Sequence, residues 1–293
     1  MFVSPSYAEI VSDVRSTIDQ KNFSSGDTLI KKYQTQHGVT PEMLEALSWL
    51  GRGALAANEY DKAEAYALKT QKLAIEQLKK RPLDQESHLP IALGAAIEVQ
   101  AQVRNARGEK AEALRFLRHE LVAYKNTSIR ARIQKNINII DLVGKPAPAL
   151  VEQEFLGPKP VPLAALKGKP VLLFFWAHWC GDCKLERREL SQVKRDFAAN
   201  GLTLIGPTQR YGYVAKGEDA TPQQELKYID EVRNKYYLDL KDMPVPVSEE
   251  NLKLYGASTT PTLVLIDKHG IVRLYHPGSM SAEELGQAIR AVL

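Results

Sequence analysis

Residues 176–184 read Trp-Ala-His-Trp-Cys-Gly-Asp-Cys-Lys, and they directly follow the apolar run Val-Leu-Leu-Phe-Phe at residues 171–175. The apolar run is typical of a buried β-strand, and the pattern from Lys184 onward is typical of a charged helix. Cys180 and Cys183 are the only cysteines among 293 residues. The sequence therefore predicts two thiols on a strand-to-helix turn, where they can close a small disulfide.

The position of this pair predicts redox chemistry. A helix N-terminus favours a thiolate over a thiol, because its free N–H groups and its dipole stabilise a nearby negative charge. We expect Cys180, which is nearer to solvent, to be the nucleophile and Cys183 to resolve the mixed disulfide. Half of a zinc site and an inert structural disulfide are the alternatives. The six histidines, at positions 37, 88, 119, 178, 269 and 276, lack the spacing of a four-ligand zinc site, so no metal is expected.

Two motifs resemble a known family. The sequence Trp-Cys-Gly-Asp-Cys-Lys at residues 179–184 resembles the thioredoxin superfamily, whose usual motif is Trp-Cys-Gly-Pro-Cys-Lys. Residues 258–267, Ser-Thr-Thr-Pro-Thr-Leu-Val-Leu-Ile-Asp, resemble the cis-proline site of the same superfamily. The resemblance implies a cis bond between Thr260 and Pro261, opposite the Cys pair, with the Thr260 backbone facing an incoming polypeptide. The alternative is an ordinary trans proline at a strand start.

The run from Pro146 to Cys180 is similar to the TlpA-like and cytochrome-maturation branch of the superfamily. Members of that branch typically have Pro-Ala-Pro, a hairpin, Leu-Lys-Gly-Lys, an apolar strand and then the Cys pair. In this chain, short strands are expected at residues 150–155 and 161–163, on either side of Gly157-Pro158. The resemblance covers about half of the chain. It implies an α/β thioredoxin-like domain at residues 144–293, with thiol:disulfide oxidoreductase activity and no cofactor other than the redox-active disulfide.

Local signals predict the remaining elements of this domain. Strands are expected at residues 202–205 and 271–275, and helices at residues 222–237 and 281–293. The connection after the first of these strands is long and contains residues 209–213, Gln-Arg-Tyr-Gly-Tyr. Long loops are often functional, so this segment is expected either to border the active site or to place its tyrosines in the core or at the rim.

Five positions around the motif support or depart from the family pattern. Trp179 and Asp182 are expected to support the active site, although the charge of Asp182 opposes a thiolate on the nucleophile. Phe174 stands where thioredoxin has a buried Asp for proton transfer. Glu186 matches a glutamate that cytochrome-maturation relatives carry after the Cys pair. It is expected either to pass the proton of the resolving cysteine or to belong to a solvated charged run. His178 is interpreted as a rim residue, with tuning of the thiolate as the alternative.

Residues 1–143 predict an all-α domain. They show hardly any strand pattern and are rich in helix-forming residues, with breaks that divide them into about seven helices. The sequence Lys-Ala-Glu-Ala recurs at residues 62–65 and 110–113, and this half resembles tetratricopeptide-type helical hairpins. Because the spacing is irregular, a plain helical bundle is the alternative. Both interpretations predict a docking or dimerisation surface.

Composition limits the partners. The formal net charge is only +4, from 39 basic and 35 acidic residues, which gives no case for nucleic-acid binding. No apolar stretch approaches 18 residues, so no membrane span is expected. The expected partners are a protein disulfide substrate and an upstream thiol donor, with a protein docked on the helical domain. The preferred function is a reductase. Its expected location is periplasmic or otherwise extracytoplasmic, with a signal or anchor that this chain does not include, and a cytoplasmic location is the alternative. The alternative function is a scaffold with a vestigial thioredoxin fold.

Overall fold

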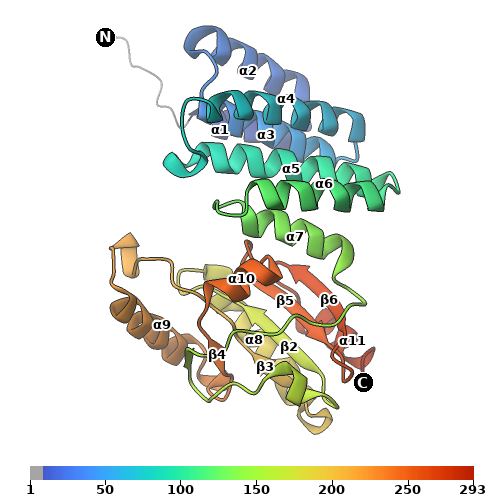
Figure 1. Cartoon of the computed structure of the whole chain (residues 1–293), viewed down its shortest axis with the longest axis vertical. Helices are drawn as coiled ribbons and strands as arrows, with labels where there is room; N and C mark the ends of the chain where they lie inside the picture. Colours follow the sequence, from blue (N-terminus) through green and yellow to red (C-terminus); the bar gives the residue numbers. More distant parts are fainter. Residues whose placement is uncertain (1–8) are drawn as a thin grey trace. The chain divides into compact units, whose positions relative to one another are not determined.

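The computed structural model describes residues 9–293, which divide into two compact units between Asn136 and Ile137 (Figure 1). The sequence predicted a division between residues 143 and 144. Residues 137–143 instead belong to the second unit, and Leu142 lies in the hydrophobic core of that unit. Within the same unit, the side-chain amide of Asn138 donates a hydrogen bond to the carbonyl of Leu254 at 3.5 Å.

The described part of the first 143 residues contains seven α-helices, which agrees with the number predicted from the breaks in the sequence. The start of α3 shows how local sequence sets a boundary: the Thr40 hydroxyl accepts the Met43 N–H at 3.3 Å, and Pro41 occupies the first helical position. The helices are α1 (Glu9–Asp19), α2 (Phe23–His37), α3 (Pro41–Ala56), α4 (Tyr60–Leu78), α5 (His88–Ala106), α6 (Lys110–Ala123) and α7 (Arg130–Asp141), with a 3-10 helix, η1 (Leu83–Gln85), before α5.

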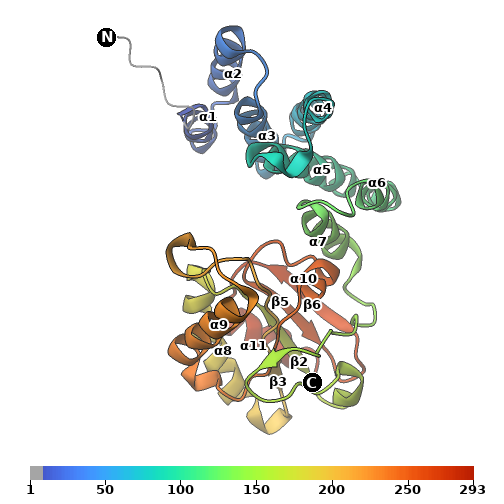
Figure 2. The ribbon, with the colours of Figure 1, turned by 60° about the vertical axis from the view of Figure 1, so that its left-hand side comes forward.

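Small residues allow the helices of the first unit to pack closely (Figure 2). A Cβ added at Gly51 of α3 would lie 3.4 Å from the Tyr66 side chain and 3.6 Å from the Ala63 carbonyl of α4. Ala63 and Ala113, one alanine from each Lys-Ala-Glu-Ala segment, are fully buried. The close approach is the property expected of these small residues. The assignment to a tetratricopeptide-type repeat stays a prediction.

The second unit is built on a four-stranded sheet with the strand order β3-β2-β5-β6. Strands β2 and β3 are parallel, whereas β2–β5 and β5–β6 are antiparallel. A separate antiparallel pair joins β1 and β4. The strands are β1 (Phe155–Leu156), β2 (Val171–Phe175), β3 (Thr203–Ile205), β4 (Val245–Pro246), β5 (Thr262–Ile266) and β6 (Val272–Pro277); the helices are α8 (Gly181–Asp196), α9 (Pro222–Tyr236), α10 (Glu249–Tyr255) and α11 (Ala282–Arg290), with 3-10 helices η2 (Leu163–Leu166), η3 (Ala198–Asn200), η4 (Ala215–Gly217) and η5 (Leu238–Leu240).

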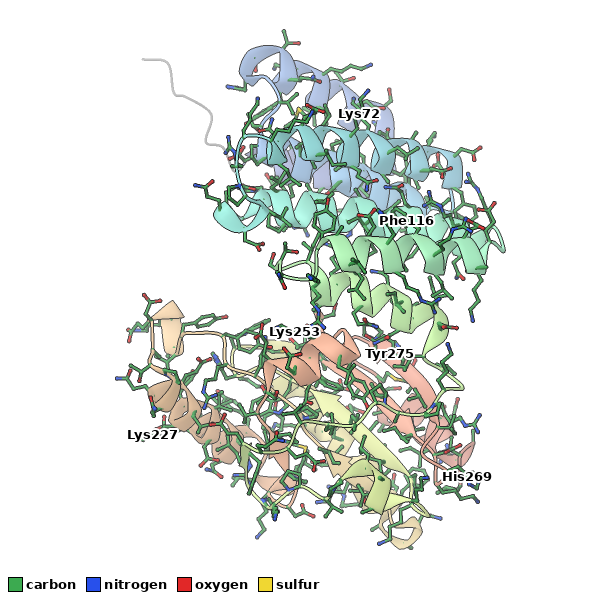
Figure 3. The ribbon with its side chains drawn as sticks, in the orientation of Figure 1. Lys72, Phe116, Lys227, Lys253, His269 and Tyr275 are labelled. Atoms are coloured by element: carbon green, nitrogen blue, oxygen red, sulfur yellow. A yellow bond between two sulfur atoms is a disulfide. The ribbon has the colours of Figure 1, made fainter. Side chains whose placement is uncertain are left out.

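Strand β2 is buried on both faces, which explains its unbroken apolar sequence. Leu172 and Phe174 pack into a core that includes residues of α8, α9 and α11. Their neighbours Leu173 and Phe175 point to the opposite core, which α10 covers. The Tyr275 hydroxyl on β6 donates to the Tyr255 carbonyl at the end of α10, at 2.8 Å (Figure 3). The sheet thus has helices on both faces, and its predicted central strand is confirmed.

The predicted strands at residues 150–155 and 161–163 are wrong. Only Phe155 of the first segment lies in a strand, and that strand pairs with β4. The backbone of Val151 instead bonds to the side chain of Asn251, which accepts its N–H at 2.7 Å and donates to its carbonyl at 2.9 Å. Val161 stands between two prolines, which lack the N–H that a strand ladder needs.

The C-terminal elements are confirmed. The Gly270 N–H donates to the Asp267 carbonyl at 2.9 Å and closes the turn between β5 and β6. Ser281 and Glu284 form a capping box at the start of α11. Among residues 9–293, no helix is both long enough and apolar enough to span a membrane.

Candidate functional site

The turn after β2 places the two cysteines at the N-terminus of α8. Cys180 is the N-cap residue, and its Sγ accepts the backbone N–H of Cys183 at 3.0 Å. The two residues form a disulfide, with their Cα atoms 5.3 Å apart. Cys180 is 3% exposed and Cys183 is fully buried. A reduced Cys180 would therefore carry its sulfur at the positive end of the helix dipole, where negative charge is stabilised.

The Thr260–Pro261 peptide bond is cis, which confirms the prediction. It lies beside the Cys pair, because the Cys180 Sγ is 3.5 Å from the Thr260 carbonyl oxygen. In the disulfide form this sulfur carries no proton, so the approach is a contact, and only a reduced Cys180 would have a proton to donate. The buried hydroxyl of Thr260 has no hydrogen-bond partner. The two segments that the sequence singled out thus meet at one place.

Glu186 is buried, so its interpretation as part of a solvated charged run is wrong. Its Oε1 accepts the backbone N–H of Met280 at 3.1 Å. Burial raises the pKa of the Glu186 carboxyl, although this bond and a bond from Ser279 act in the opposite direction. Glu186 lies one helical turn after Cys183 on α8. A carboxyl with a raised pKa at this place is a candidate to accept a proton.

The other two supporting residues behave as surface residues. Asp182 is exposed in the first turn of α8, where its charge suits the helix dipole. Trp179 is 49% exposed although it adjoins the buried Cys180. An indole exposed to this extent offers apolar surface beside the Cys pair.

The interpretation of His178 as a rim residue is wrong, because its side chain is only 1% exposed. Its Nε2 lies 3.1 Å from Oε1 of Glu225, which is equally buried at the start of α9. Three tyrosine rings surround the imidazole at centroid distances of 5.3–5.6 Å, namely Tyr211, Tyr213 and Tyr228. The burial of His178 could not be predicted from the sequence, because the partner that buries the imidazole, Glu225, is 47 residues away.

Glu225 is a site residue that sequence reasoning did not find. Besides His178, its carboxylate accepts the backbone N–H groups of Tyr211 and Gly212, the latter at 2.8 Å. Tyr211 in turn packs edge-on against Trp179, with 5.5 Å between ring centroids. The segment at residues 209–213 therefore reaches the turn that carries the Cys pair, and Tyr211 is also partly buried against the core, so features of both predicted alternatives are present. From the sequence alone, Glu225 looks like any acidic residue in a first helical turn.

The pH dependence of stability offers a test of this buried pair. Burial lowers the pKa of His178, and the bond to Glu225 only partly opposes that effect. In the unfolded chain His178 has a pKa of about 6.5. Below that pH the unfolded state binds a proton at His178 and the folded state does not. The free energy of unfolding therefore falls as the pH drops from about 6.5 towards the lowered pKa of the folded state. The decrease is up to about 1.4 kcal/mol per pH unit.

We expect His178→Gln, whose amide can still donate to Glu225, to lose this part of the pH dependence. Urea unfolding of wild type and variant at pH 7.5 and 5.5 measures the difference. The exposed His269 in the β5–β6 turn supplies the control, since His269→Gln should keep the wild-type dependence. If the free energy of unfolding changes equally with pH in all three proteins, His178 is not the source of this pH dependence.

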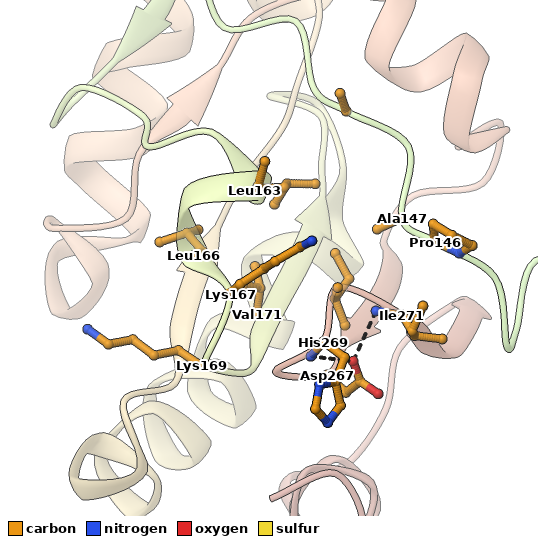
Figure 4. A pocket seen from close by; sticks show the side chains of 14 residues that line it. Pro146, Ala147, Leu163, Leu166, Lys167, Lys169, Val171, Asp267, His269 and Ile271 are labelled. Carbon is orange, nitrogen blue, oxygen red and sulfur yellow. Dashed lines mark hydrogen bonds between the residues drawn. The ribbon is translucent and has the colours of Figure 1, made fainter.

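A cavity of about 380 Å³ lies away from the cysteines (Figure 4). It is lined by Val171 and Ile266, which are the first residue of β2 and the last residue of β5. The Cys pair and the cis-proline lie at the opposite ends of these two strands. Among residues 9–293 no cluster of three or more His, Cys, Asp or Glu side chains is arranged to hold a metal ion.

Comparisons with known proteins agree with this geometry. A family model described as a thioredoxin-like domain matches residues 161–293. A thiol:disulfide interchange protein DsbE of Pseudomonas aeruginosa is 34% identical over 133 residues, which cover 45% of this chain and 64% of that protein. The DsbE proteins of Escherichia coli K12 and Pasteurella multocida are 32% and 30% identical, over 68% and 75% of their lengths and 48% and 52% of this chain.

Among solved structures, a putative thiol:disulfide interchange protein DsbE from Chlorobium tepidum is 27% identical and aligns with a TM-score of 0.40, over 51% of this chain and 96% of its own. The chain spans just under two thirds of the Pseudomonas aeruginosa relative, and the matched segments make up about half of this chain. The residues that the thioredoxin-like family model matches include both cysteines, the cis-proline and the four-stranded sheet. This chain belongs to the thioredoxin-like family of DsbE-type thiol:disulfide interchange proteins.

Proposed function

We propose that this chain is a thiol:disulfide oxidoreductase that reduces disulfides in protein substrates. The observation that carries the proposal is the position of the Cys180 sulfur, which accepts the Cys183 N–H at 3.0 Å and lies 3.5 Å from the Thr260 carbonyl. The first contact stabilises a thiolate. The second brings the Cys180 sulfur next to the backbone of the cis-proline segment, which supports the proposal that a substrate chain binds there.

The proposed exchange proceeds through the two thiols. In the reduced protein the Cys180 thiolate attacks one sulfur of the substrate disulfide, forms a mixed disulfide and expels the other substrate sulfur as a thiolate. Cys183 then loses its proton and attacks Cys180, which forms the Cys180–Cys183 disulfide and releases the second substrate thiolate. Two electrons pass to the substrate, and an external dithiol restores the reduced pair. Trp179, Thr260 and Pro261 are proposed to contact the substrate chain.

The test is reduction of insulin by dithiothreitol, followed by turbidity as the separated B chain precipitates. We expect the protein to accelerate the reaction well above the rate with dithiothreitol alone. A protein that leaves the rate unchanged would be the alternative, a scaffold with a vestigial thioredoxin fold.

The helical unit is proposed to dock a protein partner. Leu68 and Ile75 are 49% and 42% exposed, and they lie seven residues apart on α4, hence on one face. An extracytoplasmic location belongs to the same proposal, because protein disulfides form and persist in oxidising compartments. Deletion of residues 1–136 should weaken co-purification of the partner without changing insulin reduction.

The redox potential is proposed to lie at the reducing end, near the value of about −270 mV typical of thioredoxin. Asp182 adds a negative charge in the turn that holds the Cys180 thiolate, and such a charge disfavours the reduced, charged form. We therefore expect Asp182→Asn to be more oxidising by tens of millivolts, on the order that a screened surface charge produces. Equilibration with glutathione buffers measures both potentials. A wild-type value above about −180 mV would indicate an oxidase or isomerase instead.

A further inference from the structure

The contact between His178 and Glu225 links three parts of the molecule that are separate in sequence. His178 belongs to the turn that carries the cysteines, and Glu225 to the first turns of α9. The same carboxylate binds two consecutive backbone N–H groups, those of Tyr211 and Gly212. The residues of the 209–213 segment are thus held against the Cys turn through one buried acid.

Burial makes this contact specific. Both side chains are 1% exposed, and a buried carboxylate is costly unless its oxygens are hydrogen-bonded. Glu225 receives three such bonds, so removing any donor leaves part of its charge without a partner. A buried polar group that loses a partner costs more than the bond itself contributed. The arrangement therefore has one well-defined geometry.

Two aromatic rings connect the buried His178–Glu225 contact to the protein surface. Trp179 follows His178 in sequence, is 49% exposed, and packs edge-on against Tyr211 at 5.5 Å. The backbone N–H of Tyr211 is bound by Glu225, and its ring lies 5.6 Å from the imidazole of His178. We call Trp179 and Tyr211 the aromatic shelf. Trp179 directly precedes Cys180, and Tyr211 contacts both members of the buried pair, Glu225 through its backbone and His178 through its ring.

We propose that His178 and Glu225 are positioning residues that hold the aromatic shelf so that it orients polypeptide substrates at Cys180. The proposal rests on the proposed disulfide reduction. A protein substrate presents apolar and aromatic side chains next to its disulfide, and these can stack on the shelf. A small aliphatic disulfide has nothing to place there. The buried pair should therefore set the KM for protein disulfides and have little influence on small ones.

The experiment compares insulin with bis(2-hydroxyethyl) disulfide as substrates, with dithiothreitol as the reductant. For His178→Ala and Glu225→Gln we expect the KM for insulin to rise about tenfold with a smaller change in kcat, which is the signature of lost substrate binding. The kcat/KM for the small disulfide should change by less than about twofold. His178→Gln, whose amide can replace the Nε2–H donor, should restore most of the insulin KM.

Matched controls separate positioning from general damage. Glu231→Gln alters an exposed acid on the same helix, and His269→Gln an exposed histidine of the same unit, so both should keep the wild-type KM. Should the buried substitutions prevent folding, Trp179→Ala and Tyr211→Ala shorten the shelf itself and should give the same difference between substrates.

The outcomes are distinct. Wild-type protein that reduces neither substrate would refute the proposed function. If the wild type is active, but variants of the aromatic shelf or of the buried pair lose activity equally on both substrates or on neither, the positioning role is wrong. The proposed function would then still stand. A rise in the insulin KM alone, reversed by His178→Gln, supports the proposal.

Discussion

Replacing Cys180 with serine is expected to reduce insulin turnover to the rate of dithiothreitol alone. A serine hydroxyl is hardly ionised at neutral pH, so the helix N-terminus that stabilises a Cys180 thiolate has no nucleophile to act on. Replacing Cys183 with serine leaves the first attack possible and removes the thiol that completes the reaction. We therefore expect Cys183→Ser to accumulate mixed disulfides with the substrate.

Non-reducing gels and mass spectrometry measure these products directly. The Cys183→Ser protein should gain the mass of a substrate chain, and dithiothreitol should remove it. Cys180→Ser should gain no such mass, which provides the matched control because each variant has one remaining thiol. Retained activity in Cys180→Ser, or mixed disulfides through Cys183, would show that the roles of the two cysteines are reversed.

The features that the sequence predicted correctly have local causes or follow from motifs of the family. Residues 171–175 form β2 because five consecutive apolar residues suit a strand covered on both faces. Ser281 begins α11 through a bond to a residue three positions on. The Cys pair and the cis-proline were recognised from short motifs, and the 3.5 Å contact between Cys180 and Thr260 places them together.

The errors concern side chains whose partners are distant in sequence. The segment around Val151 has a strand-like pattern, yet its backbone bonds are made by Asn251, 100 residues later. His178 is polar and next to an exposed tryptophan, but Glu225 and three tyrosines bury it. Glu186 lies in a charged sequence and becomes buried only where the segment before α11 covers it. Local pattern cannot reveal such contacts, because tertiary packing creates them.

Glu186 is expected to be the base that takes the Cys183 proton. Resolution of the mixed disulfide requires the Cys183 thiolate, and Cys183 is fully buried, where solvent cannot readily accept the proton. Glu186 lies one turn further on the same helix, and the position of the usual buried Asp is occupied by Phe174. Direct transfer or transfer through one water would meet the need. We expect Glu186→Gln to lower kcat about 10²-fold, the lower end of what a positioned base contributes, and to accumulate the mixed disulfide.

The variant should fold normally, which makes the loss informative. The amide oxygen of the introduced glutamine would still accept the Met280 N–H, while the cost of a buried charge disappears. Because burial raises the pKa of Glu186, the wild-type kcat should fall in acid at a higher pH than an ordinary glutamate would produce, and Glu186→Gln should lack this limb. Glu189→Gln is the matched control, since Glu189 accepts the Ala282 N–H at 2.7 Å one turn further along α8. Equal losses in both variants would mean that Glu186 only supports the packing of α8 against the segment before α11.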